Sequence, residues 1–304
     1  MRYRINVLIG LASGLLWALN NLFVGQAGGV LPDVLYSPIG FAAINDLCSA
    51  LFLSGIYFFT GKLKNIIKEF SYSKVWPVMI AALLGGPFGQ IMYFSGIKYA
   101  GTSLAIIFTS LYPLIACIFA RIFLHQKLTI RIQIGIILAI AGSIIIGGNL
   151  GIENPMTSNV MLGIALSMLA AIAWGSEIVI AVSAMKKISA EAAILIREWT
   201  SGTTLVITVI ILYPIYQVYS TLISFPAMIL FLCIAGIFGG LSYYLWYYAN
   251  RMIGCVKGTA TNLTYILWGI FFQFLVTGQV PAVSIISGAL IIFVGVFLAV
   301  YTKD

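Results

Sequence analysis

The chain has 304 residues, of which 62% are hydrophobic and only 8% are charged, and its mean hydropathy is strongly positive. These proportions exclude a soluble globular domain of ordinary composition and predict a membrane protein. Because 16 Lys and Arg residues outnumber 8 Asp and Glu residues, the formal net charge is +8. In a membrane protein such an excess is a topology signal, so we expect no nucleic-acid partner.

Ten apolar stretches are long enough to cross a hydrocarbon core of about 30 Å. The first follows two arginines but is too long, and too polar near its centre, for a cleaved signal peptide, so we expect it to be retained. The predicted spans lie near residues 5–28, 38–61, 75–98, 102–124, 129–148, 160–185, 190–214, 226–250, 254–277 and 281–302.

Positive residues fall on alternate connections between these predicted spans. The remaining connections carry only Lys98, and Arg197 lies inside a span. Since cytoplasmic loops attract Lys and Arg, we expect a multi-pass protein of the cell membrane with both termini in the cytoplasm. The cytoplasmic set comprises Arg2, Arg4, Lys62, Lys64, Lys68, Lys74, Arg121, Lys127, Arg131, Lys186, Lys187, Arg251, Lys257 and Lys303.

The sequence repeats itself on either side of the polar segment 151–159. The first predicted span, with LLWALNNLF, matches the sixth, with AIAWGSEIV; the second approximately matches the seventh, and the fourth matches the ninth. These matches superpose Trp17 on Trp174, Asn20 on Glu177, Asp46 on Glu198, Thr109 on Asn262 and Tyr112 on Tyr265.

Each half of the chain, 1–150 and 151–304, contains five predicted spans. Because five is odd, the second copy must run through the membrane upside down. We therefore predict an all-α membrane protein with ten transmembrane helices in two inverted five-helix repeats. Inverted repeats are typical of transporters, because two similar halves can exchange conformations and open a central site to each side in turn.

Three acidic residues, Asp46, Glu177 and Glu198, lie inside predicted spans, where ionisable groups usually face a cavity, a partner or a transport pathway. Counting about 1.5 Å per residue places Glu177 and Glu198 at the same depth, each about 12 Å from the cytoplasmic end of its span, and Asn20 level with Asp46 in the outer half. If the two glutamates face each other, one should be protonated or Arg197 should lie between them. The alternative interpretation is that Glu198 pairs with Arg197 only to fix the register of the helices. A purely structural role of this kind is less expected for Glu177.

Aromatic and amide residues share helical faces with these acids. Trp174 lies one turn before Glu177, and Trp17 lies near the midplane, away from the interfacial belt that tryptophans usually occupy. Pro87 in the third span should break the helix and free backbone carbonyls near Gln90. The other candidates are Tyr243 and Tyr247 on the glycine-bearing face of the eighth span, and Asn262, Tyr265 and either Trp268 or Gly269 in the ninth.

An acid surrounded by tryptophans and tyrosines predicts a site for a bulky organic cation. Aromatic faces attract cations by about 0.5–2 kcal/mol each when desolvated. Quaternary ammonium groups suit such faces because they cannot donate ordinary hydrogen bonds. Glu177 would supply the countercharge.

Five segments also resemble the drug/metabolite transporter superfamily in its EamA form: GGPFGQIMYFSGIKYAGTSLA, SLYPLIACIFA, AIAWGSE, ILIREWTSG and YYANRMIGCVKGTATNLTYILW. Within it, AIAWGSE and the tyrosine-rich eighth span are most similar to the bacterial choline permeases of the LicB type. The resemblance covers essentially the whole chain. It implies ten helices, alternating access, choline import and a pocket of aromatics with a glutamate that maps onto Glu177.

The leading hypothesis is therefore a choline importer. Trp17, Trp174, Tyr243, Tyr247 and Trp268 would surround the trimethylammonium group, with Tyr265 nearby, while Asn20 or Asn262 would bind the hydroxyl. Protonation of Glu177 or Glu198 would couple transport to the proton gradient, with Asp46 and Arg197 as further coupling or gating candidates.

The main alternative keeps the fold and makes the chain an exporter of amino acids or other small metabolites. A zwitterion would need an anion site, for which Arg197 or Lys257 is the candidate. An enzyme is not expected, because the chain has no GxSxG, HExxH or P-loop sequence and a single histidine, His125. We expect no cofactor and no metal, and we interpret the four cysteines, which lack CxxC spacing, as core residues.

The partners expected from the sequence are the small-molecule cation and membrane lipid. GxxxG pairs, such as Gly10 with Gly14 and Gly236 with Gly240, suit helix contacts within one subunit or between two. They leave a homodimer open beside a monomer.

Overall fold

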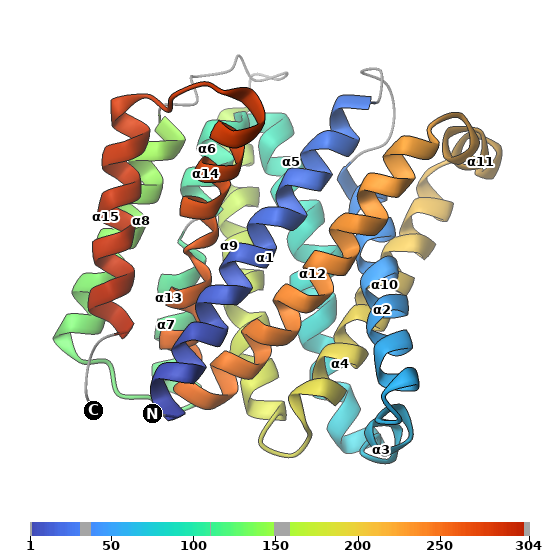
Figure 1. Cartoon of the computed structure of the whole chain (residues 1–304), viewed down its shortest axis with the longest axis horizontal. Coiled ribbons are helices and arrows are strands. Elements are labelled where there is room, and N and C mark those ends of the chain that lie inside the picture. Colours follow the sequence, from blue (N-terminus) through green and yellow to red (C-terminus); the bar gives the residue numbers. More distant parts are fainter. Residues whose placement is uncertain (1, 31–37, 110, 149–158, 301–304) are drawn as a thin grey trace.

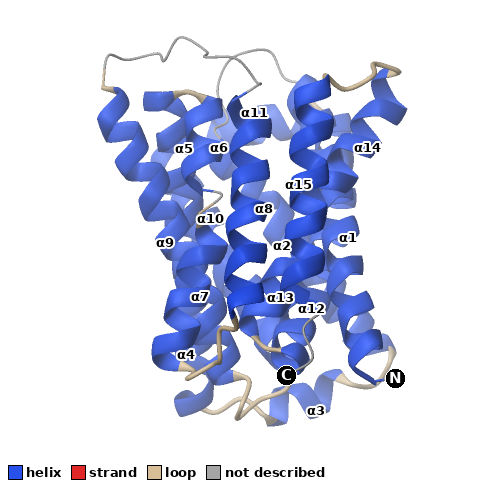
Figure 2. Cartoon of the chain, turned by 90° about the vertical axis from the view of Figure 1, so that its left-hand side faces the viewer, coloured by secondary structure: helices blue, strands red, loops and turns tan. Residues whose placement is uncertain are grey.

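The computed structural model describes residues 2–30, 38–109, 111–148 and 159–300, and this part of the chain is helical and contains no strand (Figures 1 and 2). One element, η1, is a π-helical turn within the third predicted span. The helices are α1 (Arg2–Val30), α2 (Pro38–Phe59), α3 (Leu63–Lys68), α4 (Tyr72–Leu83), η1 (Leu84–Phe88), α5 (Gly89–Ala100), α6 (Thr102–Thr109), α7 (Tyr112–Phe123), α8 (Ile130–Gly148), α9 (Val160–Ala184), α10 (Ala190–Leu212), α11 (Ile215–Ser224), α12 (Pro226–Ile253), α13 (Cys255–Asn262), α14 (Tyr265–Thr277) and α15 (Val283–Val300).

Seven helical segments are long and apolar enough to cross a membrane, and they coincide with the first three and the sixth to ninth predicted spans. Three shorter apolar helices correspond to the fourth, fifth and tenth. The all-helical membrane protein predicted from composition is thus confirmed, while the number of crossings stays a prediction. The seven are Arg2–Gly28, Ile39–Phe59, Tyr72–Ala100, Val160–Ala184, Ala190–Leu212, Pro226–Ile253 and Cys255–Thr277; the shorter three are Ile107–Phe123, Ile130–Ile146 and Val283–Ala299.

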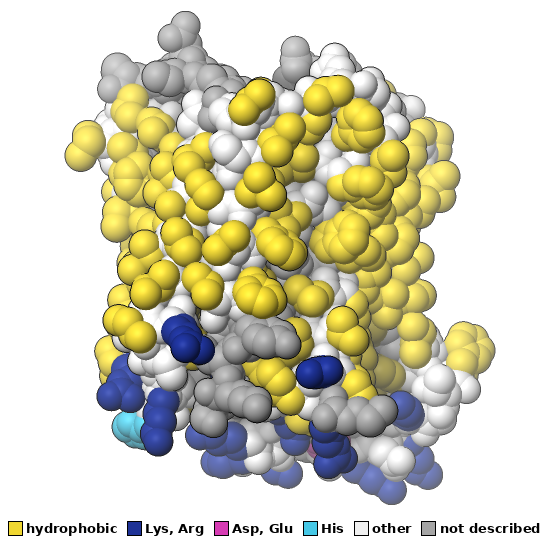
Figure 3. Space-filling model, turned by 60° about the vertical axis from the view of Figure 1, so that its left-hand side comes forward, with side chains coloured by type: hydrophobic (Ala, Val, Ile, Leu, Met, Phe, Trp, Pro, Cys, Tyr) yellow, Lys and Arg dark blue, Asp and Glu magenta, His cyan; other side chains and the backbone are white. Residues whose placement is uncertain are grey.

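The two ends of the bundle differ in charge. One end of the bundle holds the start of α1, the short helix α3 and the end of α15 (Figure 1). Helix α11 lies at the other end. On the face shown in Figure 3, hydrophobic side chains cover the middle, and Lys and Arg gather toward the end that holds α3. We call this the basic end and the opposite one the far end.

Glycines allow the closest helix approaches. On α8, a Cβ atom at Gly135 or Gly142 would collide with the backbone of Gly295 or Gly288 on α15. Small residues drive helix association in membranes because they let backbones pack closely where no hydrophobic difference from lipid exists. The same device brings together α2 and α10, where Gly202 packs against the backbone of Asp46.

Three of the predicted spans are not continuous α-helices. In the third, Pro87 interrupts the α-helix, as predicted, because proline lacks the N–H that a regular turn needs. The interruption is the π turn of η1, and the helix continues beyond it as α5. The fourth and ninth spans are divided at positions that match in the internal repeat. Helix α6 ends at Thr109 and α7 begins at Tyr112, while α13 ends at Asn262 and α14 begins at Tyr265.

The largest cluster of buried apolar side chains fills the half of the bundle nearer the basic end. It joins the last turns of α2 and α9 to the first turns of α4 and α10, with Leu53, Val78, Val182 and Ile194 among its members. Close packing of such side chains excludes water. The bundle is therefore closed toward the basic end.

Candidate functional site

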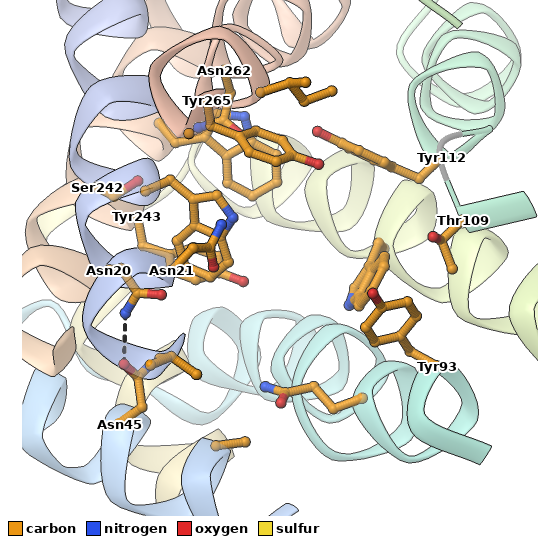
Figure 4. Close-up of a pocket in the computed structure, with 18 of the residues that line it drawn as sticks. Asn20, Asn21, Asn45, Tyr93, Thr109, Tyr112, Ser242, Tyr243, Asn262 and Tyr265 are labelled. Carbon is orange, nitrogen blue, oxygen red and sulfur yellow. Dashed lines mark hydrogen bonds between the residues drawn. The ribbon is translucent and has the colours of Figure 1, made fainter. Parts of the chain in front are cut away.

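A cavity of about 670 Å³ lies among the helices of both halves (Figure 4). From α1 and α8, which run away from the basic end, it takes residues 17–24 and residues 143–146, in the middle and far half of the bundle. The cavity therefore extends from mid-bundle toward the far end. Its lining comprises Trp17, Asn20, Asn21, Val24, Phe41, Ala42, Asn45, Asp46, Gln90, Tyr93, Phe94, Thr109, Tyr112, Ser143, Ile146, Trp174, Glu177, Ser242, Tyr243, Trp246, Asn262, Tyr265, Ile266 and Gly269.

One guanidinium holds three carboxylates beside this cavity. Nε of Arg197 donates to Glu177 Oε1 over 3.2 Å. Nη1 donates both to Asp46 Oδ2 over 3.2 Å and to Glu198 Oε1 over 3.1 Å. None of these four side chains is more than 3% exposed, so the attraction between them must offset a large desolvation cost. We call Asp46, Glu177, Arg197 and Glu198 the charged cluster.

The charged cluster confirms one expectation and corrects another. Arg197 lies between Glu177 and Glu198, as predicted if the two glutamates face each other. Asp46, however, was placed with Asn20 in the outer half, apart from the two glutamates, whereas it binds the same guanidinium as they do. Counting along upright helices missed this contact, since it ignores helix tilt and the length of an arginine side chain.

Neighbouring donors satisfy the three carboxylates unequally. Asp46 also accepts hydrogen bonds from Ser201 Oγ over 2.6 Å and from Asn45 Nδ2 over 3.1 Å. Glu177 accepts a second bond from the hydroxyl of Tyr247 over 3.2 Å. Among the described residues Glu198 has no further donor, and its Oε2 is buried without a partner.

The wall of the cavity carries negative charge. Asp46 and Glu177 line it, whereas no Lys or Arg occurs among the lining residues of the described chain. Three carboxylates face one guanidinium in the charged cluster, so the arrangement favours a cationic ligand over an anionic one.

Aromatic rings stand on several sides of the cavity. On one side Trp174 packs against Tyr93 and Tyr112, with ring centroids 5.5 and 6.4 Å apart. On another, Trp17 meets the ring of Tyr243 edge to face at 5.3 Å. In Figure 4 the hydroxyl ends of Tyr112 and Tyr265 point toward each other across the space between their helices. These rings offer faces to an ammonium group.

Three aromatic residues predicted for the pocket have other surroundings. The guanidinium carbon of Arg197 lies 3.8 Å from the ring centroid of Tyr243, so one face of this lining residue is already covered by a cation. Tyr247 is fully buried behind the wall, where it binds Glu177. Trp268 is absent from the lining and packs against Phe271 and Phe272. The alternative position from the same spacing, Gly269, does line the cavity.

Two glycines of the π turn, and Gly89 at the start of α5, press against residues of the second half. The indole N–H of Trp174 donates to the carbonyl oxygen of Gly85 over 2.8 Å, which uses a carbonyl in the proline-disrupted turn. A Cβ atom at Gly85 would overlap the carboxylate of Glu177, and one at Gly89 would press on the indole of Trp174. Only glycine permits so close an approach of backbone and side chain.

The same contacts recur in the opposite direction. On α12, a Cβ at Gly239 would meet the Asn20 amide, and one at Gly240 would meet Ser49. In the internal match Asn20 corresponds to Glu177, and Gly85 contacts Glu177. The offset that aligns Asp46 with Glu198 also aligns Ser49 with Ser201. A Cβ at Gly86 would overlap the hydroxyl of Ser201. Each half thus places a pair of glycines on the first two spans of the other.

The hydrogen bonds of the two halves also correspond. Asn20 Nδ2 donates to Asn45 Oδ1 over 2.6 Å, drawn as a dashed line in Figure 4, and Asn45 Nδ2 donates to Asp46. In the second half the equivalent series is Glu177, Arg197 and Glu198. The first half therefore carries two amides and one acid where the second carries three ionisable groups.

Sequence reasoning named about half of the lining residues; the polar and aromatic ones that it did not propose for the site include Tyr93, Asn45 and Trp246. Tyr93 lies three residues after Gln90 and thus on its helical face, a signal that was present in the sequence. Asn45 was detectable only as the neighbour of Asp46. Within the described residues no group of three or more His, Cys, Asp and Glu side chains is arranged to hold a metal ion.

A helical membrane protein with duplicated halves and a cavity at their junction has the architecture of a transporter. The sequence profile of the EamA-like transporter family matches residues 4–148 and 161–301. The chain belongs to this family.

Individual proteins resemble it along most of its length. Protein LicB of Haemophilus influenzae is 28% identical over 303 residues, covering 97% of each chain. A WAT1-related protein of Arabidopsis thaliana is 22% identical over 245 residues, which cover 74% of this chain and 62% of the plant protein. A solved crystal structure with 17% identity superposes with a TM-score of 0.75 over 97% of this chain and 96% of its own, which establishes a shared fold.

Proposed function

We propose that the protein is a secondary active transporter that imports choline or a closely related quaternary ammonium cation by alternating access. Ten spans in two inverted repeats, residues 1–150 and 151–304, would form the carrier, with both termini in the cytoplasm and the basic end on the cytoplasmic face. The reciprocal glycine contacts of the two halves support the inverted repeat. The similarity to LicB and the aromatic lining support the choice of substrate class.

A single observation carries the substrate assignment: two carboxylates and several aromatic rings line one cavity, and no Lys or Arg side chain of the described residues is part of this lining. A trimethylammonium group forms no ordinary hydrogen bonds and is stabilised by aromatic faces, each by about 0.5–2 kcal/mol when desolvated. Trp17, Trp174 and Tyr265 provide such faces, and Glu177 with Asp46 provides the countercharge.

The hydroxyl of choline would be recognised by an amide. Both hydrogen bonds of Asn20 run from its Nδ2, to Asn45 and to the carbonyl of Ala235, which leaves its Oδ1 as an acceptor. Asn262 donates from Nδ2 to Ser13 Oγ over 3.0 Å and also retains its Oδ1. Either oxygen would accept a hydrogen bond from the choline hydroxyl, so both Asn20 and Asn262 remain candidates for this role.

The lining favours a cation over the zwitterion required by the amino-acid hypothesis. An amino-acid carboxylate would need a free cation in the wall. Arg197 is already bound by three carboxylates, and Lys257 is not among the lining residues of the described chain. A zwitterion would therefore meet two carboxylates without a compensating positive group.

The shape of the cavity suits one state of an alternating cycle. With the basic end in the cytoplasm, the cavity faces outward and the apolar cluster closes the inner half. Opening the inner side requires the contacts between α2 and α10, including Asp46 with Arg197, to rearrange. A membrane potential that is negative inside favours entry of a cation by about 2.3 kcal/mol per charge per 100 mV, and protonation of the charged cluster would add coupling to the proton gradient.

The test is thermal stabilisation of the purified protein by choline and by its neutral isostere 3,3-dimethylbutanol. A ligand that binds only the folded state stabilises it by about 2.7 kcal/mol at a hundred times its dissociation constant. Choline should raise the unfolding temperature, the isostere should not, and Glu177→Gln should weaken the response. Glu191→Gln is the matched control, since this acid binds Tyr244 outside the cavity. Equal effects of the two ligands, or none from choline, would contradict the proposal.

A further inference from the structure

Glu198 differs from the other two acids of the charged cluster in how its carboxylate is satisfied. Asp46 accepts three hydrogen bonds, from Arg197, Ser201 and Asn45. Glu177 accepts two, from Arg197 and Tyr247. Glu198 accepts one, on Oε1. An ionised carboxylate is an acceptor with room for about four hydrogen bonds and is stabilised by each donor, so Glu198 is the poorest of the three sites for a negative charge.

The unused oxygen of Glu198 is also sealed from the cavity. Its side chain is 1% exposed, Oε2 has no hydrogen-bond partner, and the residue is not part of the cavity lining. Nη2 of Arg197 is likewise buried without a partner. A bare carboxylate oxygen in such surroundings carries a high desolvation cost, which binding of a proton to that oxygen removes.

The charges around Glu198 define how many protons the charged cluster needs. Its own helix contributes Arg197, α2 contributes Asp46 and α9 contributes Glu177, while Tyr243 and Tyr247 of α12 also face the cluster. Helix α10 also packs against α3, α4 and η1. Lys64 and Lys68 of α3 are exposed, Tyr72 and Lys74 of α4 lie in its first turn at the basic end, and η1 contains no titratable residue. Near neutral pH the net charge of the charged cluster therefore depends on three carboxyl groups and one guanidinium.

We propose that Glu198 is a proton-binding site whose proton crosses the membrane together with the organic cation. With Glu198 protonated on Oε2, the remaining charges are −1 on Asp46, −1 on Glu177 and +1 on Arg197. One monovalent cation in the cavity then makes the whole assembly neutral, which is the state of lowest desolvation cost when the cavity closes. Without the proton the loaded carrier keeps one uncompensated negative charge. This inference rests on the proposed function and identifies the coupling group within it.

The internal repeat supports the assignment independently. Glu198 and Asp46 occupy matching positions, but Asp46 meets Asn45 and Ser201, whereas the residue matching Asn45 is Arg197. The first-half series has two neutral amides and one acid, Asp46, whereas the second-half series has two acids, Glu177 and Glu198, on either side of Arg197. Because Asp46 also binds Arg197, three acids share this single cation.

The test compares wild type with Glu198→Gln in proteoliposomes, with the membrane potential clamped at zero. Coupling of one proton predicts that labelled choline accumulates about tenfold for each unit of an inward pH gradient. Since glutamine has the shape of the neutral acid, Glu198→Gln should bind and exchange choline yet show no accumulation driven by the gradient. Glu191→Gln, on the same helix, should accumulate like wild type.

A second measurement reads the proton without any substrate. Infrared spectra of the wild type at neutral pH should contain the carbonyl stretch of a protonated carboxylic acid. The band should vanish in Glu198→Gln and persist in Glu177→Gln.

The outcomes separate the two proposals. Gradient-driven accumulation by Glu198→Gln, or loss of its choline binding or folding, would overturn the assignment of the proton to Glu198. So would choline transport by wild type that ignores the pH gradient, although import itself would then stand. If wild type neither binds nor transports choline, the proposed function fails, and the infrared band still decides whether Glu198 carries a proton.

Discussion

The indole of Trp174 donates its N–H to the carbonyl oxygen of Gly85 over 2.8 Å, and this bond joins α9 to the π turn of η1. Gly85 belongs to the first half of the chain and Trp174 to the second. The same glycine packs against the carboxylate of Glu177, so one residue of the π turn touches both the aromatic and the acidic part of the candidate site. The shape of this turn therefore sets where Trp174 and Glu177 lie.

Replacing Gly85 with alanine should weaken choline binding while leaving the protein folded. The added methyl group overlaps the Glu177 carboxylate, which must move away from Arg197 or from the cavity. We expect the dissociation constant for choline, measured by thermal stabilisation, to rise at least tenfold, about 1.4 kcal/mol.

Gly55→Ala is the control for this substitution. Gly55 lies on α2 with no atom within 4 Å of an added Cβ, and alanine favours a helix over glycine by about 1 kcal/mol. This variant should bind choline like wild type. Equal affinities of the Gly85 and Gly55 variants would show that the π turn does not position Glu177.

Two substitutions of Trp174 should separate its aromatic face from its hydrogen bond. Trp174→Phe retains a ring but loses the bond to Gly85, whereas Trp174→Leu loses both. If the ring holds the ammonium group, the leucine variant should bind choline about 2–30-fold more weakly than the phenylalanine variant, which corresponds to 0.5–2 kcal/mol. Trp76→Leu, an exposed residue stacked on Tyr72, should leave affinity unchanged. Identical choline affinities for both Trp174 variants would assign this residue a packing role alone.

Removing the guanidinium should cost more than removing one of its acids. Arg197→Met leaves three buried carboxyls without a cation, and breaking a buried ion pair from one side costs about 3–5 kcal/mol. We expect a large drop in unfolding temperature in detergent. Adding Asp46→Asn to Arg197→Met should recover part of the loss, because it removes one uncompensated charge. A double variant less stable than Arg197→Met would mean that Asp46 is stabilised by Ser201 and Asn45 rather than by the ion pair.

Sequence reasoning located the spans and much of the cavity wall, because both depend on patterns within single helices. Long apolar runs identify spans, and the i, i+3 spacing that joins Trp174 to Glu177 survives in the folded protein. The internal repeat also aligned Tyr112 with Tyr265, and both line the cavity.

Features that depend on contacts between distant helices were less predictable. The bond from Arg197 to Asp46 depends on packing of α2 against α10, which no pattern within either helix specifies. Tyr243 and Tyr247 lie one turn apart on the same helix, yet only Tyr243 reaches the cavity. Because both lie on one face of α12, their position along the helix decides between them: Tyr247 is one turn further toward the basic end, outside the cavity lining. Glycine contacts with α1 and α2 fix the position of α12.

The thiols of Cys48 and Cys233 provide a means to test whether the two halves move. Their sulfur atoms lie 3.3 Å apart, on α2 of the first half and α12 of the second. A small approach would allow a disulfide, whose S–S bond is about 2.0 Å long. If alternating access shifts α2 against α12, oxidation with copper phenanthroline should halt choline uptake, and dithiothreitol should restore it. Cys48→Ser should transport choline and be insensitive to the oxidant. Full uptake by a protein shown by mass spectrometry to carry this disulfide would mean that α2 and α12 move as one body, and the motion would have to be sought between other helices.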